Sequence, residues 1–216
     1  MNKLIALIDG SVYSQSVCDH VAWIATRNYA EVELMHVLGR REVGSSPSNL
    51  SGNITLGART SLLNELSELD AQRAQLAQKI GREILDGAQA RIEAGGVANV
   101  TTRLRSGDIV ETVAELESDA DMIVIGKRGE AADFAKLHLG SNLERIARSS
   151  RRPVFVSSRA FQPIKRFMIA FDGGASSLKA VELVSGSKLF AGLECCLLMV
   201  GDDSDENQKR MADAQD

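Results

Sequence analysis

The sequence predicts an α/β fold in which helices cover both faces of a doubly wound, five-stranded parallel sheet. Short apolar runs alternate with segments of helical periodicity, which is the pattern of repeated strand-helix-strand units. One of these runs, residues 122–125, leads into a glycine-rich loop. In addition, the Asp-Gly pair at 9–10 recurs at 172–173, an offset of 163 residues, and predicts an incomplete β-α-β second copy.

The first half of the predicted sheet follows from apolar runs and their spacing. Residues 4–8 are wholly apolar, as expected of a parallel strand that is buried on both faces. The turn Asp9-Gly10-Ser11 follows, with an aspartate suited to cap the next helix. The further elements expected here are a helix around Val17, Val21 and Ile24, a strand at 32–38, a loop at 39–60, a helix at 62–92 ending at Gly95-Gly96, and a strand at 97–104.

The second half repeats this alternation. Asp108 is placed to cap a helix that carries Ile109, Val113 and Leu116. The apolar run at 122–125 is the next strand. The last elements expected are a short helix with Leu143, Ile146 and Ala147 on one face, and a strand at 153–156. Its proline favours a place at the sheet edge, because proline cannot donate to a central ladder.

The loop after residues 122–125 has the composition of a phosphate-binding loop. Gly126 and Gly129 follow the strand directly, and Gly140 precedes Ser141 at the start of the next helix. Glycines let backbone amides approach an anion closely, and a helix N-terminus adds unpaired donors. The same glycines also fit plain turns. Lys127 and Arg128 are either solvated loop tips or phosphate contacts.

Several other side chains have a structural and a functional interpretation. Asp9 is either a helix cap alone or a cap that also binds ribose, and Ser141 fits a plain N-cap better than a nucleophile. His36, inside a strand, is expected to be a hydrogen-bonded core histidine, whereas His20 and His138 are expected at the surface. The apolar stripe of the long helix is expected in the core, with a partner surface as its alternative. It comprises Leu62, Leu66, Leu69, Leu76, Ile80, Ile84, Ala88 and Ile92.

Composition narrows the classes of function. The chain has 216 residues, of which 44% are hydrophobic and 25% charged, as in ordinary soluble proteins. Its net charge of −4 provides no basic field for nucleic acid. Apolar runs are too short for a membrane span or a signal segment, and three cysteines without metal-ligand spacing fit a reducing compartment. We therefore expect a cytoplasmic protein whose cysteines bind no metal.

In order and spacing, these motifs resemble the universal stress protein family in its tandem form. The resemblance rests on the strand ending in Asp9-Gly10-Ser11, on Leu34-Met35-His36-Val37, and on the segment from Ala120 to Gly126. It also rests on Gly126-x-x-Gly129 followed by Gly140-Ser141, and on Arg152-Pro153-Val154-Phe155-Val156 as the last strand. It covers residues 1–158 as a complete domain and residues 159–216 as a partial second repeat with a polar tail.

The resemblance implies strand order 3-2-1-4-5 and an adenine nucleotide, ATP or similar and possibly with Mg, at the carboxyl ends of the strands. Asp9 would hold the ribose or metal side, and the backbone of Val37 would contact the adenine. The phosphates would lie against Gly126, Lys127, Arg128, Gly129, Gly140, Ser141 and Asn142. The resemblance also implies a homodimer in which the last strands, Pro153–Val156, pair in antiparallel fashion.

Three functions therefore remain open on the sequence, of which the third, an adenylating or ATP-hydrolysing enzyme built on a related fold, is not positively required by any feature of the chain. The first is a stress-response or signalling module that binds an adenine nucleotide and acts through conformational and dimer changes, with at most slow ATPase activity because no catalytic pair is apparent. The second is a dimerisation scaffold of the same fold that binds no nucleotide. The second is favoured by the ten residues between Gly129 and Gly140, one more than the family pattern, and by the acidic Glu130 and Asp133 among them.

Overall fold

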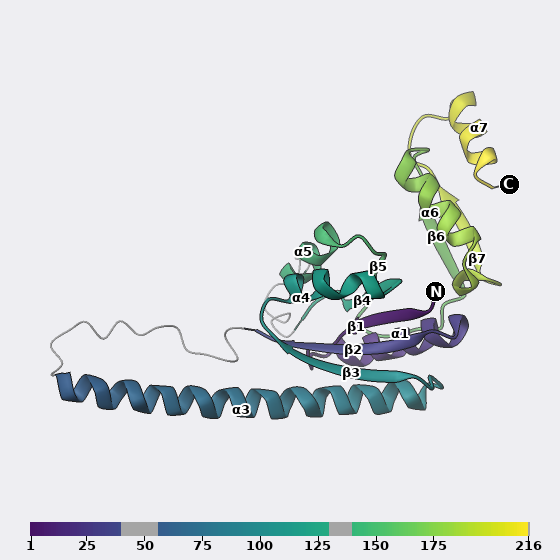
Figure 1. Cartoon of the computed structure of the whole chain (residues 1–216). Helices are drawn as coiled ribbons and strands as arrows, with labels where there is room; N and C mark the ends of the chain where they lie inside the picture. Colours follow the sequence, from purple (N-terminus) through teal and green to yellow (C-terminus); the bar gives the residue numbers. More distant parts are fainter. Residues whose placement is uncertain (40–55, 130–139, 216) are drawn as a thin grey trace. The chain divides into compact units, whose positions relative to one another are not determined.

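A computed structural model of the chain describes residues 1–39, 56–129 and 140–215 (Figure 1). It contains a five-stranded parallel sheet in the order β3-β2-β1-β4-β5, which confirms the predicted α/β fold and strand order. The strands of this sheet are β1 (Lys3–Leu7), β2 (Glu31–Leu38), β3 (Val100–Ser106), β4 (Met122–Gly126) and β5 (Val154–Ser157). The helices that connect them are α1 (Ser14–Asn28), α3 (Leu56–Ala94), α4 (Ile109–Leu116) and α5 (Ser141–Ser149), and a short 3-10 turn, η1 (Glu117–Asp119), follows α4.

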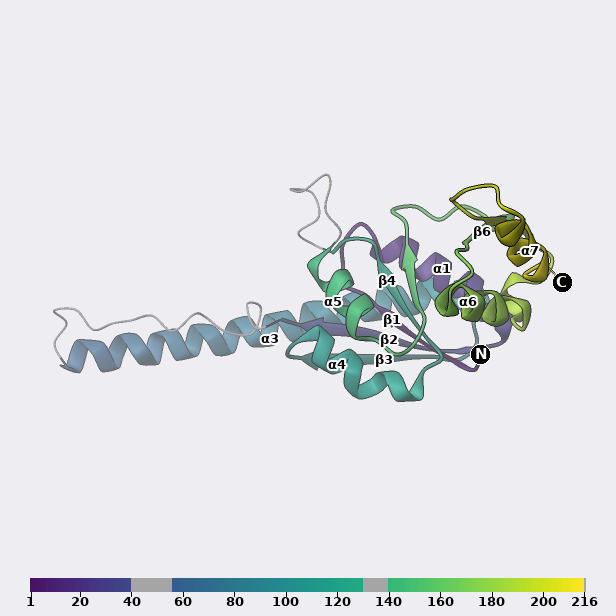
Figure 2. The same cartoon turned by 90° about the horizontal axis from the view of Figure 1, so that it is seen from above.

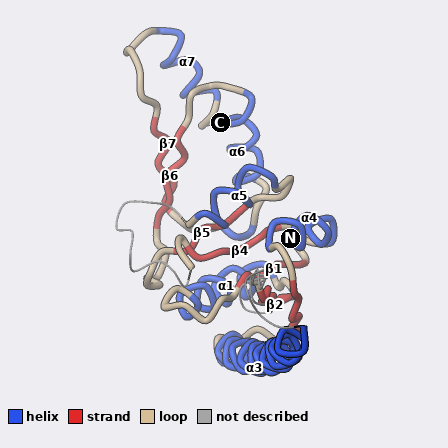
Figure 3. Tube along the Cα trace, turned by 90° about the vertical axis from the view of Figure 1, so that its left-hand side faces the viewer, coloured by secondary structure: helices blue, strands red, loops and turns tan. Residues whose placement is uncertain are grey.

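Helices cover both faces of this sheet, because successive side chains of its central strands point to opposite faces. Figure 3 shows α1 and α3 on one side of the sheet and α4 and α5 on the other. The core on the α4 and α5 side contains Ile5, Met35 and Ile123 from the strands and Val113 and Ile146 from the helices. β1 and β4 are buried along almost their whole length, which explains their continuous apolar sequences.

Some expected elements differ from the observed ones at their ends. The strand expected at 97–104 begins three residues later, at Val100, because Gly95 and Gly96 end α3 and the next residues form the connection. Residues 56–60 belong to α3 and not to the loop expected at 39–60; the rest of that loop, from 40 to 55, lies outside the described residues. The polar tail also contains a helix, α7 (Asp205–Asp213), where no helix was expected.

The long helix α3 was expected to bury its apolar stripe along its whole length, and this expectation is wrong for its first half. Leu85, Ala88 and Ile92 are buried against the domain. By contrast, Leu69 and Leu76 are 52% and 58% exposed. Figures 1 and 2 show that α3 continues well past the edge of the sheet, so its first half has no sheet beneath it.

Of the two histidines in the described residues, His36 lies where the sequence predicted and His20 does not. His36 is buried, and its Nδ1 lies 2.6 Å from the carbonyl oxygen of Ile8, as expected of a core histidine. His20 was expected at the surface and is instead buried on α1. Its ring lies 5.4 Å from that of Phe155 and 4.9 Å from that of Phe161, measured between centroids. His138 lies outside the described residues.

The chain divides into two compact units, Met1–Phe161 and Gln162–Asp216. The second unit contains a two-stranded parallel sheet with helices on its connections. Its elements are β6 (Arg166–Ala170), α6 (Ala175–Ser185), the 3-10 turn η3 (Lys188–Phe190), β7 (Glu194–Leu198) and α7. None of the helices in the described parts of the chain is both long and apolar enough to cross a lipid bilayer.

The second unit repeats the backbone pairing of the first at the offset seen in the sequence. Lys3 pairs with Glu31 in the first sheet, and Arg166 pairs with Glu194 in the second. The turns after β1 and β6 also correspond, because Gly10 and Gly173 both have positive φ angles, 75° and 73°. β1-α1-β2 and β6-α6-β7 therefore have the same local geometry.

Candidate functional site

The carboxyl ends of β1 and β4 meet in the middle of the five-stranded sheet. These two strands are neighbours, with β2 and β3 on one side and β5 on the other, so the strand order reverses between them. In doubly wound sheets, ligands bind in the crevice at this reversal point, outside the carboxyl ends of the strands. The turn after β1 carries Asp9, and the loop after β4 carries Gly126 and Gly129.

The carboxylate of Asp9 is fixed by the turn that follows β1. Its Oδ1 accepts a hydrogen bond of 3.0 Å from the amide of Ser11 and one of 3.2 Å from the hydroxyl of Ser14. The helix α1 begins at Ser14, and its N-cap residue is Tyr13, which makes no side-chain cap bond. Asp9 thus stabilises the turn and the first residue of α1 but is not the N-cap residue itself.

The other carboxylate oxygen of Asp9 faces the glycine loop. A Cβ atom built on Gly129 would lie 2.7 Å from Asp9 Oδ2, closer than real Cβ contacts come. A residue with a Cβ atom at this place would therefore require the Asp9 carboxylate to shift. The approach joins two segments that are far apart in the sequence, the turn after β1 and the loop after β4.

The remaining glycines converge on the same loop. A Cβ on Gly126 would lie 3.0 Å from Cβ of Tyr13, and one on Gly140 would lie 3.5 Å from Cα of Arg128. The amide of Gly140 donates to the carbonyl of Lys127, at 3.3 Å. This bond holds the start of α5 against the end of β4, although residues 130–139 between them lie outside the described residues.

Two of the amides expected to face an anion are already bonded within the chain. The amide of Lys127 donates to the carbonyl of Ser157 at 2.9 Å, which continues the ladder between β4 and β5, and the amide of Gly140 donates to Lys127 as described. The first amides of α5 remain as a donor set that suits an oxyanion, because the first amides of a helix have no partner within it.

The N-cap residue of α5 makes no side-chain cap bond. Gly140 is the N-cap residue and supplies no side-chain acceptor, so Ser141 is the first helical residue and not the cap that was expected. Ser141 and Asn142 are exposed, whereas Leu143 anchors the first turn in the core. Both polar side chains can therefore reach a ligand that lies over the end of the helix.

Val37 lies at the same edge of the sheet, beyond the end of β1. The carbonyl of Met35 accepts a hydrogen bond from the amide of Ile8, and β1 ends there. Because main-chain groups alternate in direction along a strand, the amide and carbonyl of Val37 point to the same side as those of Met35. They consequently face the space above the turn that holds Asp9, as a backbone contact to a base would require.

The cationic residues of the loop differ in exposure. Lys127 is exposed and Arg128 is half-buried. Glu130 and Asp133, whose charges would oppose a phosphate, lie outside the described residues. No group of three or more His, Cys, Asp or Glu side chains suited to a metal occurs within residues 1–39, 56–129 and 140–215.

An open groove of about 690 Å³ lies beside the candidate site, between α5 and β5. It is lined by Lys127, Leu143, Glu144, Ala147, Arg148, Val156, Ser157 and Ser158. Of the predicted nucleotide-binding residues it contains only Lys127, and neither Asp9 nor Val37 lines it. The groove therefore belongs to the β5 side of the domain and is distinct from the space between β1 and β4.

Sequence reasoning missed several side chains that shape the site. Ser14 binds Asp9, Tyr13 packs on Gly126, and Ser157 holds the backbone of Lys127. The spacing Asp-x-Ser-x-x-Ser at 9–14 is a signal that could have identified Ser14, because serines two and five residues after an aspartate can bond its carboxylate at a helix start. Tyr13 and Ser157 carry no comparable local signal.

Comparison with known proteins agrees with this architecture. The model of the universal stress protein family matches residues 1–158. The universal stress protein Slr1230 of Synechocystis sp. is 33% identical over 209 residues, which are 96% of this chain and 73% of the relative. The universal stress protein YxiE of Bacillus subtilis is 26% identical over 156 residues, 72% of this chain and 97% of that protein.

Among solved structures, a universal stress protein from Archaeoglobus fulgidus matches with a TM-score of 0.70 at 19% identity and covers 98% of this chain and 71% of its own. The structure of hypothetical protein MJ0577 matches with a TM-score of 0.58 at 20% identity, over 74% of this chain and 98% of its own. These two likenesses show a common fold. Because the family model covers most of the chain and Slr1230 is similar over nearly all of it, the chain belongs to the universal stress protein family.

Proposed function

We propose that this chain is a stress-response module that binds an adenine nucleotide, ATP or a similar one, in the crevice between β1 and β4. The observation that carries the proposal is the approach of Asp9 Oδ2 to Gly129, since it joins the turn after β1 to the glycine loop. Next to this contact lie the N-terminus of α5 and the outward-facing backbone of Val37. A carboxylate, a row of amides and a strand backbone match ribose, phosphate and base respectively.

In this proposal, each predicted residue has one role. Asp9 binds the ribose hydroxyls or a Mg²⁺ ion that accompanies the nucleotide, and Val37 binds the base through its backbone. The phosphates lie over the loop and the helix start, at Gly126, Lys127, Arg128, Gly129, Gly140, Ser141 and Asn142. The amides of Lys127 and Gly140 must exchange their bonds within the chain before they can contact a phosphate.

The module would act through conformation and assembly and not through catalysis. A nucleotide that binds one arrangement of the loop better than another shifts the population toward it. A second copy would sense the shift through β5, which is the edge strand of the sheet, beside the groove at α5. The carbonyls of Pro153 and Ser157 face β4, so by alternation the main chain of Val156 faces the open edge and can pair with β5 of the second copy.

The second unit fits an incomplete second copy of the first, with residues 1–158 as the complete domain and 159–216 as the partial repeat. Asp172 Oδ1 accepts from the amide of Gly174 at 2.8 Å and from the hydroxyl of Ser177 at 2.7 Å. These are the bonds that Asp9 makes with Ser11 and Ser14, at the same spacing. The described second unit has no glycine loop beside Asp172, so we assign nucleotide binding to Asp9 alone.

Calorimetry of the whole chain with ATP, in the presence and absence of Mg²⁺, tests the site. We expect binding at about micromolar to millimolar strength, and at about 100 times the dissociation constant a gain in stability of roughly 2.7 kcal/mol. Asp9→Asn should weaken binding at least about tenfold, since it removes the charge but keeps an oxygen that can accept the turn bonds. Asp172→Asn is the matched control, because Asp172 makes the same turn bonds away from the glycine loop.

Gly140→Val tests the phosphate half of the site. Among atoms of the described residues, a Cβ at Gly140 meets none closer than 3.5 Å and lies 3.8 Å from the amide nitrogen of Gly129. The fold should therefore tolerate the change while the side chain covers the loop amides, and ATP binding should be lost. If ATP binds neither the parent chain nor any variant, the alternative of a scaffold without nucleotide is correct. The two bonded amides, Lys127 and Gly140, are the observation that favours that alternative.

A further inference from the structure

The first half of α3 presents an apolar stripe that the described residues of the first unit leave uncovered. No side chain between Thr60 and Ile80 is buried, whereas Gly81, Leu85, Ala88 and Ile92 are. Five large apolar side chains of the first half are 40% to 58% exposed and Leu66 is half-buried; the five are Leu62, Leu63, Leu69, Leu76 and Ile80. Isolated apolar side chains on a surface are ordinary, but a row of them along one helix is typical of an interaction surface.

The stripe has the spacing of a coiled coil. Positions 62, 66, 69, 73, 76 and 80 alternate steps of four and three residues, and all are Leu or Ile except Arg73. This is the heptad repeat, in which two apolar positions in every seven form a seam along one side of a helix. Arg73 is the one charged residue among these six seam positions. A partner must therefore accommodate one cation in the middle of the seam.

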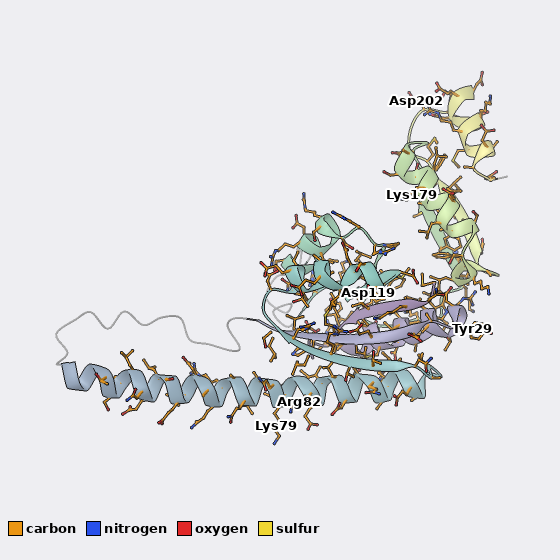
Figure 4. All side chains as sticks on the ribbon, viewed as in Figure 1. Tyr29, Lys79, Arg82, Asp119, Lys179 and Asp202 are labelled. Carbon is orange, nitrogen blue, oxygen red and sulfur yellow. The ribbon has the colours of Figure 1, made fainter. Side chains whose placement is uncertain are left out.

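The length and straightness of this segment of α3 favour another helix as the partner. Nineteen residues from Leu62 to Ile80 span about 28 Å at 1.5 Å per residue. Figures 1 and 2 both show this part of α3 as a straight rod extending beyond the sheet. Lys79 points away from the sheet (Figure 4) and directly precedes Ile80, so a charge flanks the stripe near the point where the helix reaches the domain. A flanked seam on a straight helix is what a second helix packs against.

Charge complementarity identifies a second copy of this helix, in antiparallel orientation, as the occupant. In an antiparallel pair the seam positions form layers of 62 with 80, 66 with 76, and 69 with 73. Arg73 then lies against Leu69 of the other copy. A parallel pair would instead place Arg73 against Arg73, and two like charges in the seam would oppose association.

Of the charged positions flanking the seam, Glu65 and Lys79 favour the same orientation, whereas Asp70 would face Asp70 of the other helix. Glu65 and Lys79 both precede a seam residue, Leu66 and Ile80. In the antiparallel layers, Glu65 of one helix lies opposite Lys79 of the other, and symmetry provides this pair twice. In a parallel pair these side chains would be fourteen residues apart along the axis, about 21 Å, and could not meet.

We propose that two copies of this chain associate through the first halves of their α3 helices, from Leu62 to Ile80, as an antiparallel two-helix coiled coil. The contact is separate from the edge strand β5 and does not depend on nucleotide binding. Since the seam has fewer than three heptads, and isolated short helices are marginal, we expect a dissociation constant on the order of micromolar.

Light scattering with size-exclusion chromatography over about 1 to 100 μM tests the seam. Leu69→Gln/Leu76→Gln removes two seam side chains while keeping good helix formers, and it should raise the dissociation constant at least tenfold. The matched control is Asn64→Gln/Ala71→Gln, which adds the same side chain to the outward face of the same exposed segment. The control should associate like the parent chain, and circular dichroism should show equal helix content in all three.

A charge exchange tests the orientation. Glu65→Lys and Lys79→Glu should each weaken association, because each single change creates like-charged pairs across the seam. The double variant Glu65→Lys/Lys79→Glu should restore it, since it exchanges the two charges of an antiparallel pair. Weakening without restoration would contradict the antiparallel arrangement.

A separate variant at the β5 edge distinguishes association through β5 from association through α3. Val156→Pro removes an edge amide that faces away from β4 and should leave α3 association unchanged. If only Val156→Pro lowers the mass, or if the parent chain is monomeric at 100 μM, the α3 proposal is wrong. It is also wrong if Leu69→Gln/Leu76→Gln leaves the mass unchanged but lowers the Tm, because the stripe is then covered within one chain.

Discussion

At the scale of single residues, the hydrogen bonds that a carboxylate accepts determine its role. Asp108 is the clearest case in the described chain. Its Oδ1 accepts from the amides of Val110 and Glu111, at 2.8 and 3.3 Å, so it is the N-cap of α4. Arg145, on α5, donates to both of its oxygens, at 3.1 and 2.9 Å. One side chain thus caps one helix and ties it to the next.

Replacing Asp108 should therefore destabilise the first unit measurably. Loss of an N-cap acceptor costs about 1 kcal/mol, and we expect Asp108→Ala to lower the free energy of unfolding by 1 to 2 kcal/mol, on the order of a strong cap. Arg145→Ala removes only an exposed ion pair and should cost less than about 1 kcal/mol. Urea unfolding at pH 7 measures both. Equal losses for the two variants would contradict the primary role of the cap.

The same residue predicts a pH dependence. The hydrogen bond from Arg145, with help from the amides of Val110 and Glu111, lowers the pKa of Asp108 below its ordinary value of 3.8. A lowered pKa in the folded state means that the stabilisation is complete above about pH 4 and is lost as the pH falls through the folded-state value. The difference between the parent chain and Asp108→Ala should hence be constant from pH 5 to 7 and shrink below pH 4.

Cysteine reactivity should follow burial. Burial raises the pKa of the Cys18 thiol to about 11, although the charge of Arg91 opposes the shift. The thiolate is the reactive form, so Cys18 should resist alkylation at pH 8. Cys195 and Cys196 are exposed. Iodoacetamide should thus add two groups to the folded chain, seen by intact mass, and a third only in urea; rapid labelling of Cys18 in the folded chain would contradict this.

The role of a single residue was predicted correctly from the sequence where it depends only on neighbouring residues in the chain. Asp108 precedes an apolar helix, and His36 lies inside a buried strand, so one segment contains all the information that the prediction needs. His20 was misplaced because its surroundings include Phe155 and Phe161, which lie more than a hundred residues away in the sequence. For the same reason the contact of Asp9 with Gly129 could be inferred only through the order of the strands.

At the scale of elements, α3 shows that a correctly predicted helix need not be buried along its whole apolar face. Its apolar periodicity runs from Leu62 to Ile92, interrupted only at Arg73, and predicted one long helix correctly. Periodicity reports that one face of a helix is apolar, but it does not report what covers that face. The sheet covers the last part of the stripe only, because the strands are four to eight residues long and α3 has 39.

Substitutions along this stripe should divide in the same way. Leu85 is 3% exposed and Leu69 is 52% exposed on the same helix. Leu85→Ala should lower the free energy of unfolding by about 2 to 5 kcal/mol, because it leaves a cavity in the core. Leu69→Ala should change it by no more than about 0.5 kcal/mol when the protein is dilute enough to be monomeric. Urea unfolding checks both, and a large loss at Leu69 would mean that the stripe is covered within the chain.

At the scale of the whole molecule, two units of different burial share one local geometry. The offset of 163 residues read from the sequence also relates the strand registers, the positive φ angles of Gly10 and Gly173, and the turn bonds of Asp9 and Asp172. α7 was missed because the segment has little apolar periodicity, although Ser204 and the acidic residues that follow it are a helix start signal. The second unit thus repeats the turn geometry and strand register of the first, but its strands are less buried.

This difference in covering predicts a difference in local stability. β1 is buried at four of its five positions, whereas β6 has no buried position and belongs to a two-stranded sheet. Two strands alone are marginally stable in water, so β6 and β7 should open far more often than β1 and β4. Hydrogen exchange of the full chain, followed by mass spectrometry, should show exchange of 166–170 and 194–198 at least about a hundredfold faster than that of 3–7 and 122–126. The short edge strand β5 serves as an internal control and should be intermediate. Equal protection of β1 and β6 would contradict the prediction and would mean that another surface covers the second sheet in solution.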